Sequence, residues 1–244
     1  MNGAFFWVGD EGFGTYRFAN GQPTERIEAE PEGVATPGFV DLHVHGGYGV
    51  DFMASPPEDL ARWFETLEGL GYSALLPTTV TASVSDVLAA FSRCPEHPLV
   101  AGFHLEGPFL SPKFPGAQPP HAIVDPPAGP SEWDAVLHDP RLRYITLAPE
   151  RPGALELIQR LAERGVTVSL GHTDATYEEC QMAYDAGARH TTHTYNAMRG
   201  LHHREAGTVG FALAEAGVNA ELIYDRVHVC REAAAILAKA KGAD

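Results

Sequence analysis

The feature that most constrains the fold is an alternation of short apolar runs with longer amphipathic segments, which repeats from Pro37 onward. Expected strands cover residues 39–44, 74–80, 100–105, 144–147, 166–170, 188–193 and 220–224. Between the first two strands, Leu60, Trp63 and Leu67 recur at the spacing of one helical face. Strands that alternate with helices through short links form a parallel sheet wrapped by helices. The sequence therefore predicts an α/β fold.

Two α/β architectures fit this pattern. Seven strands are close to the eight of a (β/α)8 TIM-like barrel. A doubly wound open sheet is the alternative, but no glycine-rich phosphate-binding motif follows the first strand. Polar residues gather instead at the carboxyl ends of successive strands, where a barrel carries its active site. We predict a barrel over residues 37–244 that is incomplete at its C-terminus, because an eighth strand is due where the sequence reaches Asp244.

Two helix starts carry a recognisable signal. Thr176 and Glu179 have the spacing of a capping box, and so do Ser55 and Glu58. Gly187 stands where a glycine would end the helix that begins after Thr176.

Residues 1–36 predict a separate small β segment, part of a β-sandwich, because short β-like runs alternate there with glycine-rich turns. The net charge of −15 argues against nucleic acid or an anionic membrane as a partner. Cys94, Cys180 and Cys230 lack the spacing of a disulfide framework or a zinc knuckle. No apolar stretch could span a bilayer and the N-terminus has no basic region, so we expect a soluble, cytoplasmic protein.

Chemically informative residues begin in the first expected strand, which reads PGFVDLHVHGGYGVD. Alternation along a strand places His43 and His45 on the same side. A glycine-rich loop follows at once and lets a ligand approach closely. Two imidazoles one pleat apart can bind a single cation, although histidines of a strand can also simply bond to carbonyl groups.

Further candidates follow at the ends of later strands. Glu106 ends the third strand, and His172 and His193 stand at the ends of the fifth and sixth. In a barrel these side chains converge with the first strand on one rim, so the candidate ligands are His43, His45, Glu106, His172 and His193. Imidazoles and a carboxylate suit Zn²⁺ or Fe²⁺, as one ion or as two bridged by Glu106. His104 and His190 are expected to be packing residues.

Six stretches, in order between Pro37 and Val229, resemble the N-acetylglucosamine-6-phosphate deacetylase family of the amidohydrolase superfamily. They read PGFVDLHVHGGYGVDFM, HLEGPFLSPKFPGAQ, GHTDATYEE, THTYNAM, LHHREAGTVG and DRVHV. The resemblance implies a barrel of the metal-dependent hydrolase type. It also implies hydrolysis of the acetamide of N-acetylglucosamine-6-phosphate to glucosamine-6-phosphate and acetate.

The resemblance also implies roles for individual residues. Glu106, His172 and His193 match the principal metal ligands, and the HxH pair matches the residues that add a second metal in some members. Substrate-binding roles follow for Gln118, Asn196, the backbone of Ala197, Arg204 and His228. Arg204 matches an arginine that reaches the phosphate of a neighbouring subunit, which implies a homodimer.

The sequence departs from the family at several positions. Gln118 replaces a frequent histidine and, because an amide does not titrate, is given a binding role only. Arg226 stands where the family usually has glycine. The general-base aspartate of strand eight would fall beyond Asp244, so no catalytic acid or base is visible. Two alternatives therefore stay open, namely another amidohydrolase-superfamily amidase and an inactive fragment that binds metal and sugar phosphate.

Overall fold

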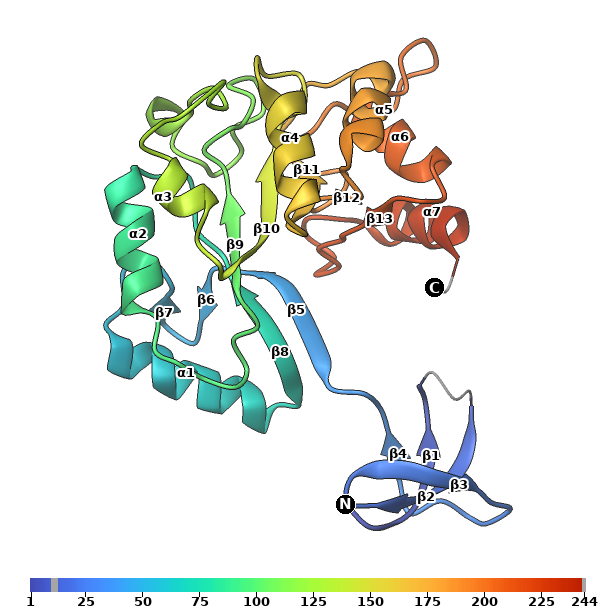
Figure 1. Cartoon of the computed structure of the whole chain (residues 1–244). Helices are drawn as coiled ribbons and strands as arrows, with labels where there is room; N and C mark the ends of the chain where they lie inside the picture. Colours follow the sequence, from blue (N-terminus) through green and yellow to red (C-terminus); the bar gives the residue numbers. More distant parts are fainter. Residues whose placement is uncertain (10–12, 243–244) are drawn as a thin grey trace.

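The computed structural model describes residues 1–9 and 13–242. At the N-terminal end, four strands form a small sheet in the order β3-β2-β1-β4. Their bounds are β1 Gly3–Trp7, β2 Gly14–Ala19, β3 Gln22–Arg26 and β4 Val34–Ala35. Trp7, Phe18 and Ala35 form the buried centre of this sheet, with Phe5 and Tyr16 against it. Figure 1 shows the sheet set apart from the rest of the chain and joined to it by the segment before β5.

The rest of the chain alternates strands with helices, as the sequence predicts. The strands are β5 Phe39–Val44, β6 Gly46–Gly47, β7 Val50–Asp51, β8 Tyr72–Pro77, β9 Phe103–Glu106, β10 Leu142–Leu147, β11 Thr167–Leu170, β12 His190–Thr191 and β13 Asn219–Ala220. The helices are α1 Pro57–Gly69, α2 Val84–Arg93, the 3₁₀ helix η1 Pro120–Ala122, α3 Asp134–Leu137, α4 Ala154–Glu163, α5 Tyr177–Ala186, α6 Gly207–Ala214 and α7 Arg231–Lys241.

The long strands run parallel and follow one another in chain order. β9 to β13 form a five-stranded sheet, and β5 pairs with β8. Parallel bridges from Leu75 to Val100 and from Thr78 to His104 connect β8 with the β9 region. The resulting order, β5-β8-β9-β10-β11-β12-β13, has no reversal, whereas a doubly wound sheet reverses at its switch point. Within the described residues no strand pairing joins β13 to β5, so the sheet is not closed.

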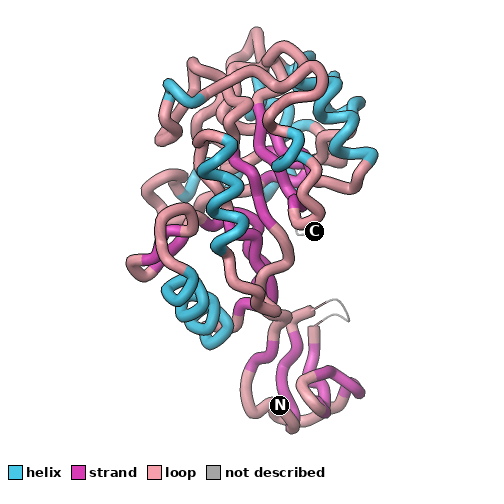
Figure 2. The backbone as a smooth tube through the Cα atoms, turned by 60° about the vertical axis from the view of Figure 1, so that its left-hand side comes forward, coloured by secondary structure: helices cyan, strands magenta, loops and turns pink. Residues whose placement is uncertain are grey.

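Helices cover the outer side of this curved sheet (Figures 1 and 2). Leu157, Ile158 and Leu161 of α4 are buried, and they belong to the same large hydrophobic core as Ile145 and Val168 of the sheet. Burying a leucine or isoleucine side chain stabilises the fold by roughly 1.5–3 kcal/mol. This core holds the strands in a fixed curve, so that the residues at their carboxyl ends face one another.

The two predicted capping boxes have different outcomes. Thr176 and Glu179 form the reciprocal hydrogen bonds of the box at the start of α5. The prediction for Ser55 is wrong, because α1 begins after Pro56 without a side-chain cap. The Ser55 hydroxyl accepts the backbone N–H of Asp51 instead, at 2.9 Å.

Two further observations concern the ends and the surface of the chain. Asp244, where the sequence places the start of an eighth strand, lies outside the described residues. None of the helices in the described part of the chain is long and apolar enough to cross a membrane.

Candidate metal centre

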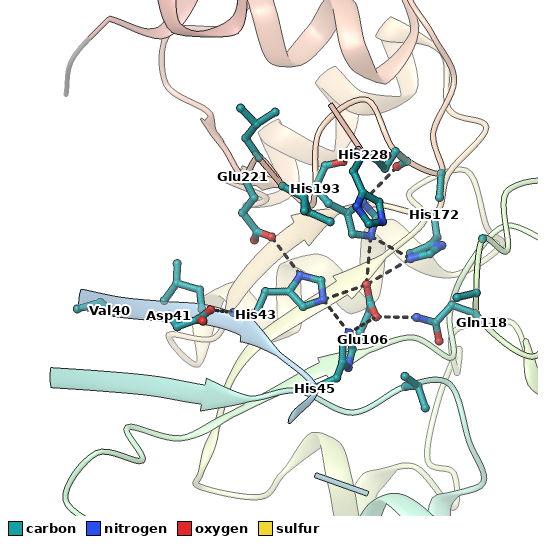
Figure 3. Close-up of a pocket in the computed structure, with 18 residues that line it drawn as sticks. Val40, Asp41, His43, His45, Glu106, Gln118, His172, His193, Glu221 and His228 are labelled. Atoms are coloured by element: carbon teal, nitrogen blue, oxygen red, sulfur yellow. Dashed lines mark hydrogen bonds and ion pairs between the residues drawn. The ribbon is translucent and has the colours of Figure 1, made fainter. Parts of the chain in front are cut away.

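The five predicted metal ligands lie together at the carboxyl ends of four strands (Figure 3). His43 is in β5 and His45 follows it, while Glu106 is the last residue of β9. His172 and His193 come just after β11 and β12. They form two groups that share one residue, namely His43, His45 and Glu106, and Glu106, His172 and His193. Within each group the possible ligand atoms lie within 4.8 Å of one another.

Glu106 is the centre of this arrangement, and its side chain is buried. Its Oε1 atom lies 3.2 Å from Nε2 of His172 and 3.2 Å from Nε2 of His193. Nε2 of His43 is 3.3 Å from the same oxygen, and Nε2 of His45 is 3.3 Å from Oε2. Every one of the four imidazoles therefore presents its Nε2 atom to a single carboxylate.

The partner of the other ring nitrogen, Nδ1, indicates which nitrogen carries the proton in each histidine. Nδ1 of His45 is 3.1 Å from the carbonyl oxygen of Thr78. Nδ1 of His172 is 3.0 Å from that of Phe114, and Nδ1 of His193 is 3.2 Å from the carbonyl oxygen of Asn196.

Nδ1 of His43 faces the Glu221 carboxylate at 3.2 Å. Carbonyl and carboxylate oxygens only accept hydrogen bonds, so each Nδ1 carries a proton and donates it. In the neutral rings, all four Nε2 lone pairs then point at Glu106.

The charges at the centre favour a negative carboxylate. Burial would raise the pKa of Glu106, but the hydrogen bonds from the four histidines outweigh it and hold that pKa well below its usual value. Burial likewise opposes a charge on His43, but the carboxylates of Glu106 and Glu221 on its two sides raise its pKa to about 10. The ionised carboxylate of Glu106 is therefore balanced by positive charge beside it, carried either by a protonated histidine or by a bound cation.

These donors fit a divalent cation. Since the four Nδ1 atoms donate to partners of their own, the four Nε2 atoms face an ionised carboxylate, and either protons on the imidazoles or a cation must lie between them. Imidazole nitrogen and carboxylate oxygen are ligands of zinc and of other first-row divalent ions. The described residues therefore offer two overlapping three-ligand groups that could hold such an ion.

Gln118 is already engaged with this centre. Its Oε1 atom accepts the backbone N–H of Thr81 at 2.7 Å, which fixes the orientation of the amide. Its Nε2 atom consequently donates to Oε2 of Glu106, at 2.6 Å. Gln118 lines the same cavity, where the sequence places it as a substrate-binding residue.

Two ligands depend on an unusual backbone conformation. His172 has φ +49° and His193 has φ +33°, both in the left-handed region that side chains other than glycine rarely adopt. Such a residue costs about 1–3 kcal/mol and persists where the surrounding structure determines it. Backbone hydrogen bonds do so here, because His172 bonds to Ser111 through its carbonyl and the Asn196 N–H bonds to the His193 carbonyl.

Sequence reasoning missed Glu221, which is half-buried, and Tyr144, which is buried, beside His43. Glu221 follows β13 and bonds to Nδ1 of His43, and Tyr144 of β10 donates its hydroxyl hydrogen to the other Glu221 oxygen. His104 stacks edge-on against His43 and donates from Nδ1 to the carbonyl of Leu42 at 2.9 Å. Burial lowers the pKa of His104 to about 3, which agrees with its predicted role as a packing residue.

A cavity of about 800 Å³ opens above the centre. Asn196, Ala197 and His228, all predicted to bind substrate, line it together with Gln118. Arg204, predicted to reach a partner's phosphate, is exposed and is not among the lining residues.

Two neighbouring residues complete the description of the rim. His228 donates from Nδ1 to the Asp225 carboxylate at 2.6 Å, and this bond lowers the pKa of Asp225 to about 2. Arg226, at the position where the resemblance described above leads us to expect glycine, has φ +66°, a conformation that glycine adopts most easily. Arg226 is exposed and does not line the cavity.

Comparison with known proteins gives a consistent result. Residues 34–242 match the model of the amidohydrolase family. An N-acetylglucosamine-6-phosphate deacetylase of Lysinibacillus sphaericus is 39% identical over 216 residues, which are 85% of this chain and 56% of that protein. An N-acetylgalactosamine-6-phosphate deacetylase of Escherichia coli O157:H7 is 40% identical over the same shares of the two chains. The chain thus spans a little over half the length of these curated relatives.

Solved structures agree with the sequence comparison. An N-acetyl-D-glucosamine-6-phosphate deacetylase variant of Mycobacterium smegmatis, in complex with N-acetyl-D-glucosamine-6-phosphate, has a TM-score of 0.83 and 34% identity. The match covers 98% of this chain and 68% of that one. The enzyme of Thermotoga maritima has a TM-score of 0.87 and 33% identity over 97% of this chain and 66% of that one. The relatives compared above are N-acetylglucosamine-6-phosphate and N-acetylgalactosamine-6-phosphate deacetylases, and the chain itself belongs to the amidohydrolase family, with a TIM-barrel-like α/β domain.

Proposed function

We propose that the protein removes the acetyl group of N-acetylglucosamine-6-phosphate by metal-dependent hydrolysis, giving glucosamine-6-phosphate and acetate. The observation that carries this proposal is the convergence of four imidazole Nε2 atoms on the buried Glu106 carboxylate, at the base of the large cavity. The relatives' names supply the substrate class. One relative acts, by its name, on the galactosamine isomer, so an assay should compare both sugars.

We propose that Glu106, His172 and His193 hold the principal ion, and that His43 and His45 with Glu106 hold a second. Zinc or iron is the expected metal, because the ligands are imidazoles and a carboxylate. When bound, such an ion lowers the pKa of water toward neutrality and polarises an amide carbonyl.

The chain's own residues would bind and orient the sugar. Asn196, the backbone of Ala197 and His228 line the cavity, and in the family resemblance these positions contact the sugar phosphate. The Asp225 carboxylate keeps the His228 ring in place through its Nδ1 atom, so that Nε2 is available to a substrate hydroxyl. Arg204 would act on the phosphate bound by a second copy in a homodimer.

The proton transfer step would use an aspartate that the family resemblance places after Asp244, on an eighth strand that completes a closed (β/α)8 barrel between β13 and β5. General acid–base catalysis of this kind typically contributes about 10²- to 10⁴-fold to a rate.

Three measurements test the proposal. We expect metal analysis of the purified chain to find zinc or iron, and calorimetry to show binding of N-acetylglucosamine-6-phosphate but not of unphosphorylated N-acetylglucosamine. Acetate release from either sugar phosphate is measured on the same sample. Equal binding of the phosphorylated and unphosphorylated sugars would favour another amidase of the family, and a chain without bound metal would contradict the proposal.

A further inference from the structure

We propose that Glu221 is a positioning residue: its carboxylate fixes the His43 ring as a metal ligand and thereby determines whether the group of His43, His45 and Glu106 can hold an ion. This inference rests on the metal-dependent function proposed above. It assigns a role to a half-buried residue that the proposed reaction does not otherwise use.

The argument begins with an asymmetry among the four histidines. His45, His172 and His193 each donate Nδ1–H to a backbone carbonyl. His43 alone uses a side chain, and Glu221 is the only hydrogen-bond partner of its Nδ1 atom in the described part of the chain. The orientation of the His43 ring thus depends on a single carboxylate.

That carboxylate is itself held in place at both oxygens. Oε1 accepts the hydroxyl hydrogen of Tyr144, and Oε2 faces Nδ1 of His43 at 3.2 Å. The backbone of Glu221 is fixed as well, because its N–H bonds to the Thr191 carbonyl and its carbonyl accepts the Thr194 N–H. Glu221 therefore has little freedom to turn away from His43.

The bond also sets the chemistry of the opposite ring nitrogen. Because the carboxylate only accepts, Nδ1 keeps its proton and the Nε2 lone pair faces Oε1 of Glu106 at 3.3 Å and Nε2 of His45 at 3.1 Å. A carboxylate on the far nitrogen fixes the tautomer and increases the basicity of a ligating imidazole. Asp41, the other nearby acid, bonds to the backbone N–H of His43 and not to its ring.

The test removes the carboxylate while keeping its volume. Metal-free Glu221→Leu is titrated with Zn²⁺ beside the wild-type chain, by calorimetry and by metal analysis after dialysis. We expect the wild type to bind two ions. The variant should keep the ion of the Glu106, His172 and His193 group and bind the second about 10- to 100-fold more weakly. Glu221→Gln, which retains an acceptor for the His43 N–H but no charge, should lie between them.

A matched control separates this effect from general destabilisation. Tyr177 donates its hydroxyl hydrogen to Glu215 in the same kind of pair, but no histidine of the centre contacts it. Glu215→Leu should keep both ions. If Glu221→Leu does not fold, Tyr144→Phe tests the same bond by freeing one Glu221 oxygen, and a smaller selective loss of the second ion is expected.

Several results would overturn the inference. They are a wild-type chain that binds one ion only, an unchanged second affinity in Glu221→Leu or in a folded Tyr144→Phe, and an equal weakening of both ions. Failure of the proposed deacetylation is distinguishable, since it would appear as two bound ions without release of acetate.

Discussion

At the base of the cavity, the two oxygens of Glu106 are shared among five side chains, four imidazoles and the amide of Gln118. No other carboxylate belongs to both candidate metal groups. Glu106→Gln keeps the shape of the side chain but removes its charge. An NH₂ group would replace one carboxylate oxygen and would point its N–H groups at the imidazoles.

We therefore expect Glu106→Gln to lose bound metal almost completely, because both groups share this ligand. Metal analysis of the purified variant measures the effect. Glu215→Gln, which changes a carboxylate outside the centre, should keep wild-type metal content. Full metal content in Glu106→Gln would refute the ligand assignment.

His104 provides a prediction for pH. Its pKa is lowered to about 3 by burial, against about 6.5 for an unfolded histidine. Between these values the unfolded chain binds a proton that the folded chain does not, so His104 makes the protein less stable as the pH falls from about 6.5 toward 3. Its contribution to the slope approaches 1.36 kcal/mol per pH unit.

Metal-free His104→Gln should lose less stability than the wild type over this pH range, because glutamine does not titrate. Urea unfolding at several pH values between 4 and 7 measures both slopes. Equal slopes in the two proteins would show that His104 titrates in the same way in the folded and unfolded states.

Site residues can be predicted from the sequence where they follow a regular pattern. His43 and His45 are recognisable from strand alternation, and Glu106 from its place at a strand end. Glu221 and Tyr144 carry no such signal, since each stands in a run that reads as an ordinary strand. Their contact joins residues 77 positions apart and depends on the curvature of the sheet, which a single sequence does not determine.

Among the elements, helices agree with the sequence more closely than strands do. α5 covers Tyr177–Ala186, between Thr176 and Gly187, the two residues that the sequence predicts at its ends. The expected strands at 188–193 and 220–224 shorten to the two-residue strands β12 and β13. After β12 the backbone turns into the left-handed region at His193, which ends strand geometry where the ligand is needed.

The start of α5 yields a prediction for this scale. The Thr176 side chain accepts the backbone N–H of Glu179, and the Glu179 carboxylate bonds back to the N–H of Thr176. Replacing such a cap by alanine typically costs about 0.5–2 kcal/mol.

We expect Thr176→Ala to lower the free energy of unfolding by about that amount, measured by urea denaturation. Gln181→Ala on the same helix is the control and should change it by less than about 0.5 kcal/mol, because this side chain is only partly buried and bonds to an exposed aspartate. Equal effects of the two substitutions would argue against a capping contribution.

For the whole molecule, the open edge of the sheet is the most consequential feature. Among residues 1–9 and 13–242, β5 pairs with β8 and with no other strand, and its first residues, Phe39 and Val40, have 60% and 62% of their surface exposed. An exposed apolar edge strand is a template for pairing with another chain. We expect the 244-residue chain to associate as its concentration rises.

Phe39→Lys should reduce this association, because a charged side chain on an edge opposes strand pairing. Sedimentation velocity at several concentrations measures the effect. Phe13→Lys, at an equally apolar residue that is 70% exposed in the N-terminal part, is the control and should associate like the wild type. If both substitutions act equally, general surface hydrophobicity and not the sheet edge is responsible.

The different partners of the four imidazoles bear on how such a centre changes over generations. A point mutation replaces a side chain but leaves the peptide carbonyl in place. The hydrogen bonds that orient His45, His172 and His193 therefore do not depend on which side chain their partner residue carries. The hydrogen bond that orients His43, in contrast, is lost when the single residue Glu221 is replaced by one without a side-chain acceptor. Lineages of this protein could therefore gain or lose an ion at one side of the centre while the other side stays as it is.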